Sequence, residues 1–234
     1  MDINLSSLAA LAKNDVNSQK PMRDGIEIEK GVILTEEYLT KNRKFFEEMM
    51  MLFTAYPDIY LDIIKPVDSN FTLFFYQRIT LRAIMRYKEV YVTAPRAFSK
   101  SFITILGEIL QCIFIPGTRR FICAPNKNQS AQIAKEKIIE IYDRFPLLRK
   151  EIIGGEVSDT PGNFGKDYVS LKFRNGSTFE VVGALESTRG QRKHGGLIDE
   201  VRDHDETLIS EVVLPLLNVS RRLPDNTVNP KEVN

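Results

Sequence analysis

A lysine and a serine stand between a short loop and a helical pattern in the segment EVYVTAPRAFSKSFITILGEIL. Residues 89–93 are rich in β-branched residues and predict a strand, whereas the apolar positions after Ser101 recur at helical spacing. The free N–H groups of a helix N-terminus attract phosphate oxygens. A lysine at this place can span the β- and γ-phosphates, and the next hydroxyl can coordinate Mg²⁺. The segment therefore predicts a phosphate-binding loop that ends in Lys100 and Ser101.

This loop departs from the common pattern G-x4-G-K-[ST], because Ala94 and Ser99 occupy the two glycine positions. Both residues carry a Cβ where glycine permits positive φ. An ordinary strand, turn and helix with an incidental Lys-Ser pair is the alternative interpretation of this segment. The predicted nucleotide contacts are Ala94, Pro95, Arg96, Ala97, Phe98, Ser99, Lys100 and Ser101.

A second chemical feature is the acidic pair in GGLIDEV, where a short apolar run ends in Asp199 and Glu200. In P-loop ATPases, an aspartate at this place holds Mg²⁺ through water, and the adjacent glutamate polarises the attacking water. Gly195 and Gly196 interrupt the apolar run, so the predicted strand is short. A surface Asp-Glu pair is the alternative, and the alternating α/β context favours the catalytic interpretation.

Charge and composition narrow the possible partners. The 32 Lys and Arg residues nearly balance the 31 Asp and Glu residues, so any DNA contact must come from local basic clusters. The N-terminus lacks a basic flank and a long apolar run, and no later stretch has the length of a membrane span. We therefore expect a protein that acts in the cytoplasm and not in a membrane.

Metal or disulfide chemistry is not expected from the histidines and cysteines. His194 and His204 bracket the acidic pair, but their spacing matches no recognised metal site. Cys112 and Cys123 have neither paired nor metal-ligand spacing, and we expect both in the core.

Short β-rich runs alternate with amphipathic helices, which is typical of an α/β fold with a parallel sheet. Asn175-Gly176 predicts a hairpin that adds an antiparallel pair to that sheet. Helical spacing also occurs after Ser99, and after Thr35 in a helical lobe. The predicted strands are 89–93, 120–123, 169–173, 178–182 and 197–199, a further helix is predicted at about 129–145, and a connector at 58–70.

The segment PRAFSKS resembles the phosphate loop of the large terminase subunits of tailed bacteriophages, the ATPases of viral DNA-packaging motors. In that family an arginine sits four residues before the lysine, and Arg96 matches it. The resemblance implies that Arg96 stabilises charge on the transferring phosphate. Gln77 matches a glutamine that reads adenine, with Phe75 or Tyr76 able to stack on the ring.

Two further segments match the order of motifs in this family. RRFICAPNKNQSAQIAKEK is similar to a strand that ends in Ala-Pro, followed by a Gln-x-Ala helix. Arg189-Gly190 precedes the acidic strand, and the resemblance implies that Arg189 reaches the site of a neighbouring subunit, with Arg192 as the second candidate. A solvated basic loop, or one that contacts DNA phosphates, is the alternative.

The resemblance covers residues 58–223 and implies a P-loop NTPase fold of the RecA-like type, with a mainly parallel sheet flanked by helices. It divides the chain into an N-terminal helical lobe (1–57), an ATPase core (58–223) and a polar tail (224–234). A strand with a coupling motif and a nuclease domain follow in the family. Neither is recognisable here, so we expect a fragment with weak turnover.

The implied ligands are ATP and Mg²⁺, with Mg²⁺ held by Ser101 and Asp199 and catalysis by Glu200, Arg96, Lys100 and Arg189. The implied partners are double-stranded viral DNA, a portal protein, a small terminase subunit and further copies of the chain in a ring. The implied location is the host cytoplasm, transiently at the procapsid portal. A helicase-like RecA-fold ATPase and a non-hydrolysing nucleotide-binding assembly module remain alternatives.

Overall fold

The computed structural model describes residues 36–95, 97–155, 157–183 and 191–217, and the chain divides into two compact units, 1–51 and 52–234. The described part of the first unit contains α2 (Glu36–Lys41) and the beginning of α3 (Arg43–Ala55). Within it, Tyr38 and Phe46 pack edge to face, with ring centroids 6.5 Å apart. The helical segment predicted after residue 35 is therefore present.

The second unit is built on a five-stranded sheet with the order β2-β3-β4-β1-β5. Strand β1 pairs in parallel with β4 and with β5, whereas β3 runs antiparallel to β4 and to β2. The sheet is thus mixed, as the predicted parallel sheet with an antiparallel addition requires, although parallel pairs do not outnumber antiparallel ones among the described strands. The strands are β1 (Arg119–Cys123), β2 (Asn163–Phe164), β3 (Val169–Lys172), β4 (Thr178–Val181) and β5 (Gly195–Ile198).

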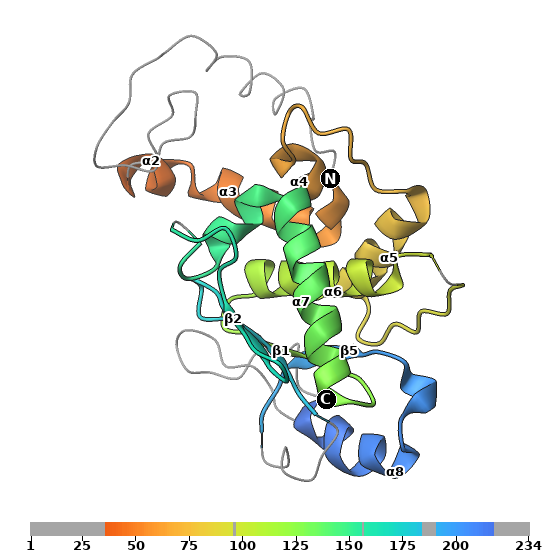
Figure 1. The fold of residues 1–234 in the computed structure, drawn as a ribbon. Coiled ribbons are helices and arrows are strands. Elements are labelled where there is room, and N and C mark those ends of the chain that lie inside the picture. The colour runs from red at the N-terminus through yellow and green to blue at the C-terminus, as the bar shows by residue number, and fades with distance from the viewer. Residues whose placement is uncertain (1–35, 96, 156, 184–190, 218–234) are drawn as a thin grey trace. The chain divides into compact units, whose positions relative to one another are not determined.

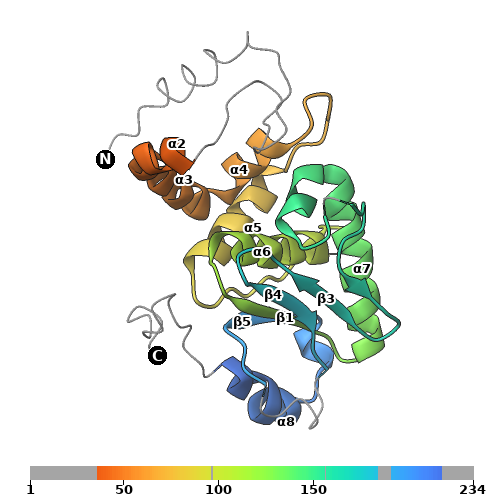
Figure 2. The same cartoon turned by 90° about the vertical axis from the view of Figure 1, so that its left-hand side faces the viewer.

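Helices cover both faces of this sheet (Figures 1 and 2). The longest, α6 (Lys100–Phe114) and α7 (Lys127–Arg144), pack on one face and form the main core with Ile122 and Phe179. Short helical turns cover the other face around Phe121 and Cys123. The remaining elements are α4 (Pro57–Ile64), α5 (Phe75–Arg86), η1 (Pro146–Glu151), η3 (Val201–Asp203), α8 (Glu206–Leu208), η4 (Ile209–Val213) and η5 (Leu214–Leu217).

Local signals in the sequence located most of these elements. Strands β1, β3 and β4 lie within a residue of their predicted ranges, and the predicted hairpin turns at Gly176, which has a φ of 82°. The predicted connector is wrong in its first half, because 57–64 form α4. Pro57 suits the first helical position, and Asp58 in the first turn is held by arginines of α5.

The strand predicted at 89–93 does not form. This segment has no ladder partner among the described residues, and the side chains of Val90 and Tyr91 are exposed, Tyr91 by 81%. β-branched residues favour an extended backbone, but a strand requires a neighbour to bond its N–H and C=O groups. The sheet therefore lacks the parallel pairing expected for this segment, and its antiparallel part comes from β2 and β3.

Strand β5 begins two residues earlier than predicted and includes both glycines of the GGLI run. A Cβ at Gly195 would lie 1.6 Å from Nη1 of Arg120, and one at Gly196 would lie 2.4 Å from Cδ1 of Phe121. The Arg120 guanidinium passes beside Gly195 and binds Glu108 of α6, with Nε to Oε2 at 2.6 Å and Nη2 to Oε1 at 3.1 Å. The glycines therefore make room for neighbouring side chains and do not shorten the strand.

Both cysteines are buried in the core, as the sequence predicted, and burial raises the pKa of Cys112 well above its ordinary value. Desolvation disfavours the thiolate, so this thiol is a core residue with low reactivity. Within the ranges that the structure covers, no helix combines enough length with enough apolar character to cross a membrane.

Candidate functional site

The predicted phosphate loop leads directly into α6, whose first residue is Lys100. Ser99 stands at the N-cap position without a side-chain hydrogen bond to the helix and has a φ of 57°, and Ala97 has a φ of 66°. These values belong to the left-handed region, which favours glycine. Of the two positions where the common loop pattern has glycine, Ser99 has a positive φ and Ala94 does not. The other residue of the loop with a positive φ is Ala97.

The beginning of α6 meets the end of β5. The Ser101 hydroxyl donates to Oδ2 of Asp199 at 3.3 Å, although the two residues are 98 positions apart in the sequence. Asp199 is 7% exposed, and its Oδ1 accepts the backbone N–H of Glu200 at 3.1 Å. The Nε2 of His204 donates to the backbone oxygen of Asp199 at 3.0 Å, which fixes the chain just after the strand. Serine and aspartate are thus held facing each other.

A looser pair lies beside this contact. Lys100 Nζ and Glu200 Oε1 are 3.8 Å apart, and the two side chains are 30% and 47% exposed. Glu200 also has a φ of 48°, an unusual value for a residue with a Cβ. Because strained backbone concentrates at functional positions, this outlier supports a functional role for Glu200. An exposed pair of this length contributes little to folding, so both groups can turn toward a ligand.

Ser101 and Asp199 offer two oxygen ligands, which suits a small hard cation that takes its other ligands from water and substrate. Mg²⁺ binds proteins through one or two oxygen ligands and completes its shell with water and substrate phosphates. In the described part of the chain, no group of three or more His, Cys, Asp or Glu residues is placed to hold a metal. The residues present therefore fit Mg²⁺ that arrives with a phosphate ligand.

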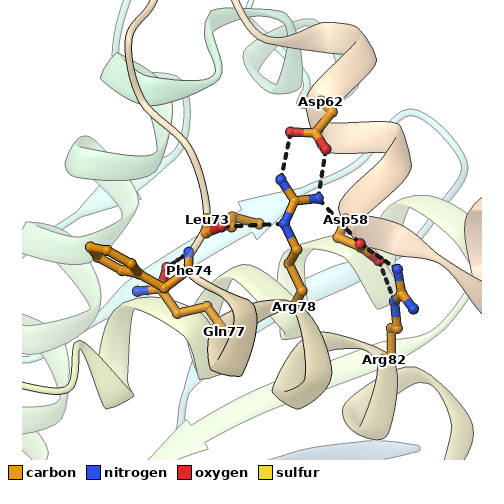
Figure 3. Close-up of polar contacts among 7 residues, drawn as sticks. All are labelled: Asp58, Asp62, Leu73, Phe74, Gln77, Arg78 and Arg82. Atoms are coloured by element: carbon orange, nitrogen blue, oxygen red, sulfur yellow. Dashed lines mark hydrogen bonds and ion pairs between the residues drawn. The ribbon is translucent and has the colours of Figure 1, made fainter.

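The residues expected around adenine are only partly arranged as predicted. Gln77 is 4% exposed, and its Oε1 accepts the backbone N–H of Phe74 at 2.9 Å, so the amide faces the beginning of its own helix (Figure 3). Tyr76 stacks on Phe98 of the loop, with ring centroids 4.0 Å apart. Phe75, the other predicted stacking residue, is 79% exposed and lies in none of the described ring pairs.

Two residues of the basic segment before β5, Lys193 and His194, make contacts within the folded chain. Lys193 is 4% exposed and its Nζ lies 2.5 Å from Oε2 of Glu180, so this lysine is not a solvated DNA contact. Nδ1 of His194 accepts the backbone N–H of Arg119 at 3.0 Å, which links β5 to β1. Arg192 is exposed. Two predicted catalytic residues, Arg96 and Arg189, lie outside the described residues.

Two features of the site were missed by the sequence analysis. One is Phe74, whose ring stacks on Tyr76, although the aromatic run in FTLFFYQ was a visible signal. The other is the ion pair between Glu108 and Arg120, which ties α6 to the sheet behind the site. A charged residue inside an apolar helical stripe was the signal for that pair.

Together, these contacts place an ammonium, a hydroxyl and two carboxylates at one junction of the sheet with α6. The set offers a cationic contact for an anion, oxygen ligands for a hard cation and an exposed base. Such an arrangement can bind a phosphorylated ligand and accept a proton beside it. Comparisons with protein-family models and with curated proteins give no match for this chain.

Proposed function

We propose that this chain binds ATP with Mg²⁺ at residues 94–101 and hydrolyses it, as the ATPase of a viral DNA-packaging motor. The observation that carries the proposal is the 3.3 Å contact between Ser101 and Asp199, joined by the Lys100–Glu200 pair. The beginning of α6 and the end of β5 lie side by side, as a nucleotide site built from a phosphate loop and an acidic strand would require. If Lys100 and Ser101 were an incidental pair, their contacts with Glu200 and Asp199 would have no explanation.

Each residue has a part in the proposed reaction. Lys100 leaves its loose pair with Glu200 and binds the β- and γ-phosphate oxygens. Ser101 and Asp199 would hold Mg²⁺, which neutralises phosphate charge when it is bound. Glu200 then accepts a proton from water while the water oxygen bonds to the γ-phosphorus and the bond to the β-phosphate oxygen breaks. The products are ADP and inorganic phosphate.

The exposure of Glu200 suits the role of a base. Its carboxylate must reach a water molecule, and the side chain is 47% exposed on the turn that follows β5. Asp199 is buried and hydrogen-bonded, so it is suited to a fixed ligand role. Proton acceptance by a placed base contributes about 10²–10⁴-fold to a rate.

The packaging role is the less direct part of the proposal and is supported by the order of Gln77, Arg96, Lys100, Arg189 and the acidic pair along the chain. Arg96 and Arg189 would add charge around the γ-phosphate, Arg189 from a neighbouring copy in a ring. The partners would be double-stranded viral DNA, the portal and the small terminase subunit, in the host cytoplasm and at the procapsid.

Calorimetric titration with a non-hydrolysable ATP analogue and Mg²⁺, together with phosphate-release assays, tests the ATPase proposal. Lys100→Ala should weaken binding at least about tenfold, a loss equal to about 1.4 kcal/mol. Glu200→Gln should keep binding and lose about 10²-fold or more in turnover. Lys135→Ala and Glu136→Gln on the exposed side of α7 are matched controls and should change neither quantity.

Wild-type affinity in Lys100→Ala would contradict the phosphate-loop assignment. Binding without phosphate release, in the presence of DNA and portal, would favour the non-hydrolysing assembly module. Unwinding of a DNA duplex would favour the helicase-like alternative, whereas a packaging ATPase should require portal and procapsid and leave the duplex intact.

A further inference from the structure

Three aromatic rings form a column beside the phosphate loop. The rings of Phe74 and Tyr76 are stacked with centroids 5.7 Å apart and planes at 9°. Tyr76 and Phe98 follow with centroids 4.0 Å apart and planes at 29°. Phe98 precedes Lys100 by two residues, so the column connects the beginning of α5 with the proposed phosphate contact.

The column is open to solvent, unlike the aromatic pairs of the core. Phe74 is 65% exposed, and Tyr76 and Phe98 are only partly buried. In contrast, Phe145, which also packs in an aromatic pair, is 1% exposed. Stacked rings with accessible faces can accept another flat ring on top, in an offset arrangement. The column is therefore placed to bind a planar group next to a cationic phosphate contact.

A nucleobase is the planar group that comes attached to phosphates. Every base has a π-face, and stacking of a base on an aromatic side chain contributes without regard to the base's hydrogen-bonding pattern. Phe98 belongs to the same loop as Lys100, so one short segment can contact the two parts of a nucleotide. A lysine with no aromatic neighbour would bind the phosphates alone.

We propose that Phe74, Tyr76 and Phe98 form a stacking platform that holds the base of the bound nucleotide and accepts adenine and guanine almost equally. This inference rests on the proposed function, because it concerns the base of the same nucleotide. It differs from the sequence-based expectation, in which Gln77 reads adenine specifically.

The loss of specificity follows from the orientation of Gln77. Its Oε1 accepts the backbone N–H of Phe74 (Figure 3), and the side chain is buried. Recognition of the adenine amino group requires an accessible acceptor, and this oxygen is already bonded to a backbone N–H on a side chain that is only 4% exposed. The remaining NH₂ donates, and both purines present an acceptor at N7. Hydrogen bonding by Gln77 therefore does not separate adenine from guanine.

Calorimetric titrations of the full chain with Mg²⁺ and one of three ligands test the platform: an ATP analogue, the matching GTP analogue and inorganic tripolyphosphate. ATP and GTP analogues should bind within about threefold of each other, and tripolyphosphate about tenfold more weakly. Phe98→Leu should remove about tenfold of the affinity for both nucleotides and leave tripolyphosphate unchanged. Tyr87→Leu, an exposed aromatic residue at the end of α5, is the control and should change none of the three.

Phe74→Leu provides a second variant, because its exposed ring can be removed without a cavity, and it should weaken both nucleotides about threefold. Equal affinity for tripolyphosphate and ATP would overturn the platform and leave the phosphate site intact. A preference of about a hundredfold for ATP over GTP would overturn the tolerance for both purines. If none of the three ligands binds, the proposed function fails with it.

Discussion

Two ion pairs connect α6 to the sheet region, and they differ in almost every physical property. Glu108 and Arg120 form a two-pronged pair with 6% and 13% exposed side chains, and the shorter contact is 2.6 Å. Lys100 and Glu200 form a single contact of 3.8 Å with 30% and 47% exposed side chains. The buried pair fixes the helix, whereas the exposed pair can be exchanged for a ligand. The site thus separates its reactive groups from its frame, by which we mean the buried ion pairs that fix the helices around it.

The strongest test of this comparison removes one partner from each pair. Glu108→Ala leaves Arg120 buried with its charge uncompensated and should lower the free energy of unfolding by about 3 kcal/mol. Lys100→Ala removes an exposed contact and should change it by less than about 0.5 kcal/mol. Urea denaturation followed by circular dichroism measures both values. Similar losses in the two variants would contradict the distinction between frame and site.

Gly195 extends the comparison, because this glycine lets Arg120 reach Glu108. In Gly195→Ala, the new Cβ would lie 1.6 Å from Nη1 of Arg120, and the guanidinium would have to leave the buried pair. We expect a loss of about 2 kcal/mol in unfolding free energy. In an Arg120→Ala background the same change should cost much less, since the obstructing atoms are gone. Additive losses in this double-mutant cycle would show that the glycine serves another purpose.

Parts of this architecture could be predicted because their signals are local. The spacing of apolar residues in 100–114 indicated α6, and Asn175-Gly176 indicated the hairpin. Ser101 and Asp199 lie close together, which is compatible with the prediction that both are ligands of one Mg²⁺ ion. Residue type and spacing were sufficient in these cases, since each prediction depended on a few neighbouring residues.

Other parts could not be predicted because they depend on distant partners. Residues 89–93 have the composition of a strand, but pairing is a property of the neighbouring chain segment. The role of Gly195 depends on the path of Arg120, which no local pattern reveals. The adenine contact of Gln77 stays a prediction, and the contact that the structure shows for its oxygen is a local one, to the backbone N–H of Phe74. The side-chain orientation decides its chemistry, and the sequence does not contain it directly.

A third buried carboxylate, Asp58, tests whether ion pairs hold the frame outside α6 as well. Burial works to raise the pKa of Asp58, but the hydrogen bonds and charge of Arg82 and a hydrogen bond from Arg78 outweigh it and lower the pKa overall (Figure 3). A lowered folded-state pKa stabilises the protein above the ordinary aspartate pKa, about 3.9. That stability is lost as the pH falls through the lower folded-state value.

Asp58→Asn should therefore lower the unfolding free energy by about 1.5 kcal/mol at pH 7. The difference between the variant and the wild type should shrink as the pH falls below the ordinary aspartate pKa, about 3.9, toward the lower folded-state value. Urea titrations between pH 3 and pH 7 measure this difference. Asp68→Asn, a change of an exposed aspartate on the loop after α4, is the matched control. A constant difference across the pH range would mean that the charge of Asp58 is not what stabilises the frame.

The smallest expected effect has the opposite sign and lies in the loop. Ser99 adopts a φ of 57°, which costs an L-residue roughly 1 kcal/mol relative to glycine. Ser99→Gly should raise the unfolding free energy by about 1 kcal/mol, less the entropy that glycine gains in the unfolded chain. Ser158→Gly, in a region with ordinary φ, should not stabilise the protein. If Ser99→Gly lowers the unfolding free energy as Ser158→Gly does, then the positive φ of Ser99 carries no cost in the folded protein. A glycine at this position of a phosphate loop would then serve ligand binding rather than stability.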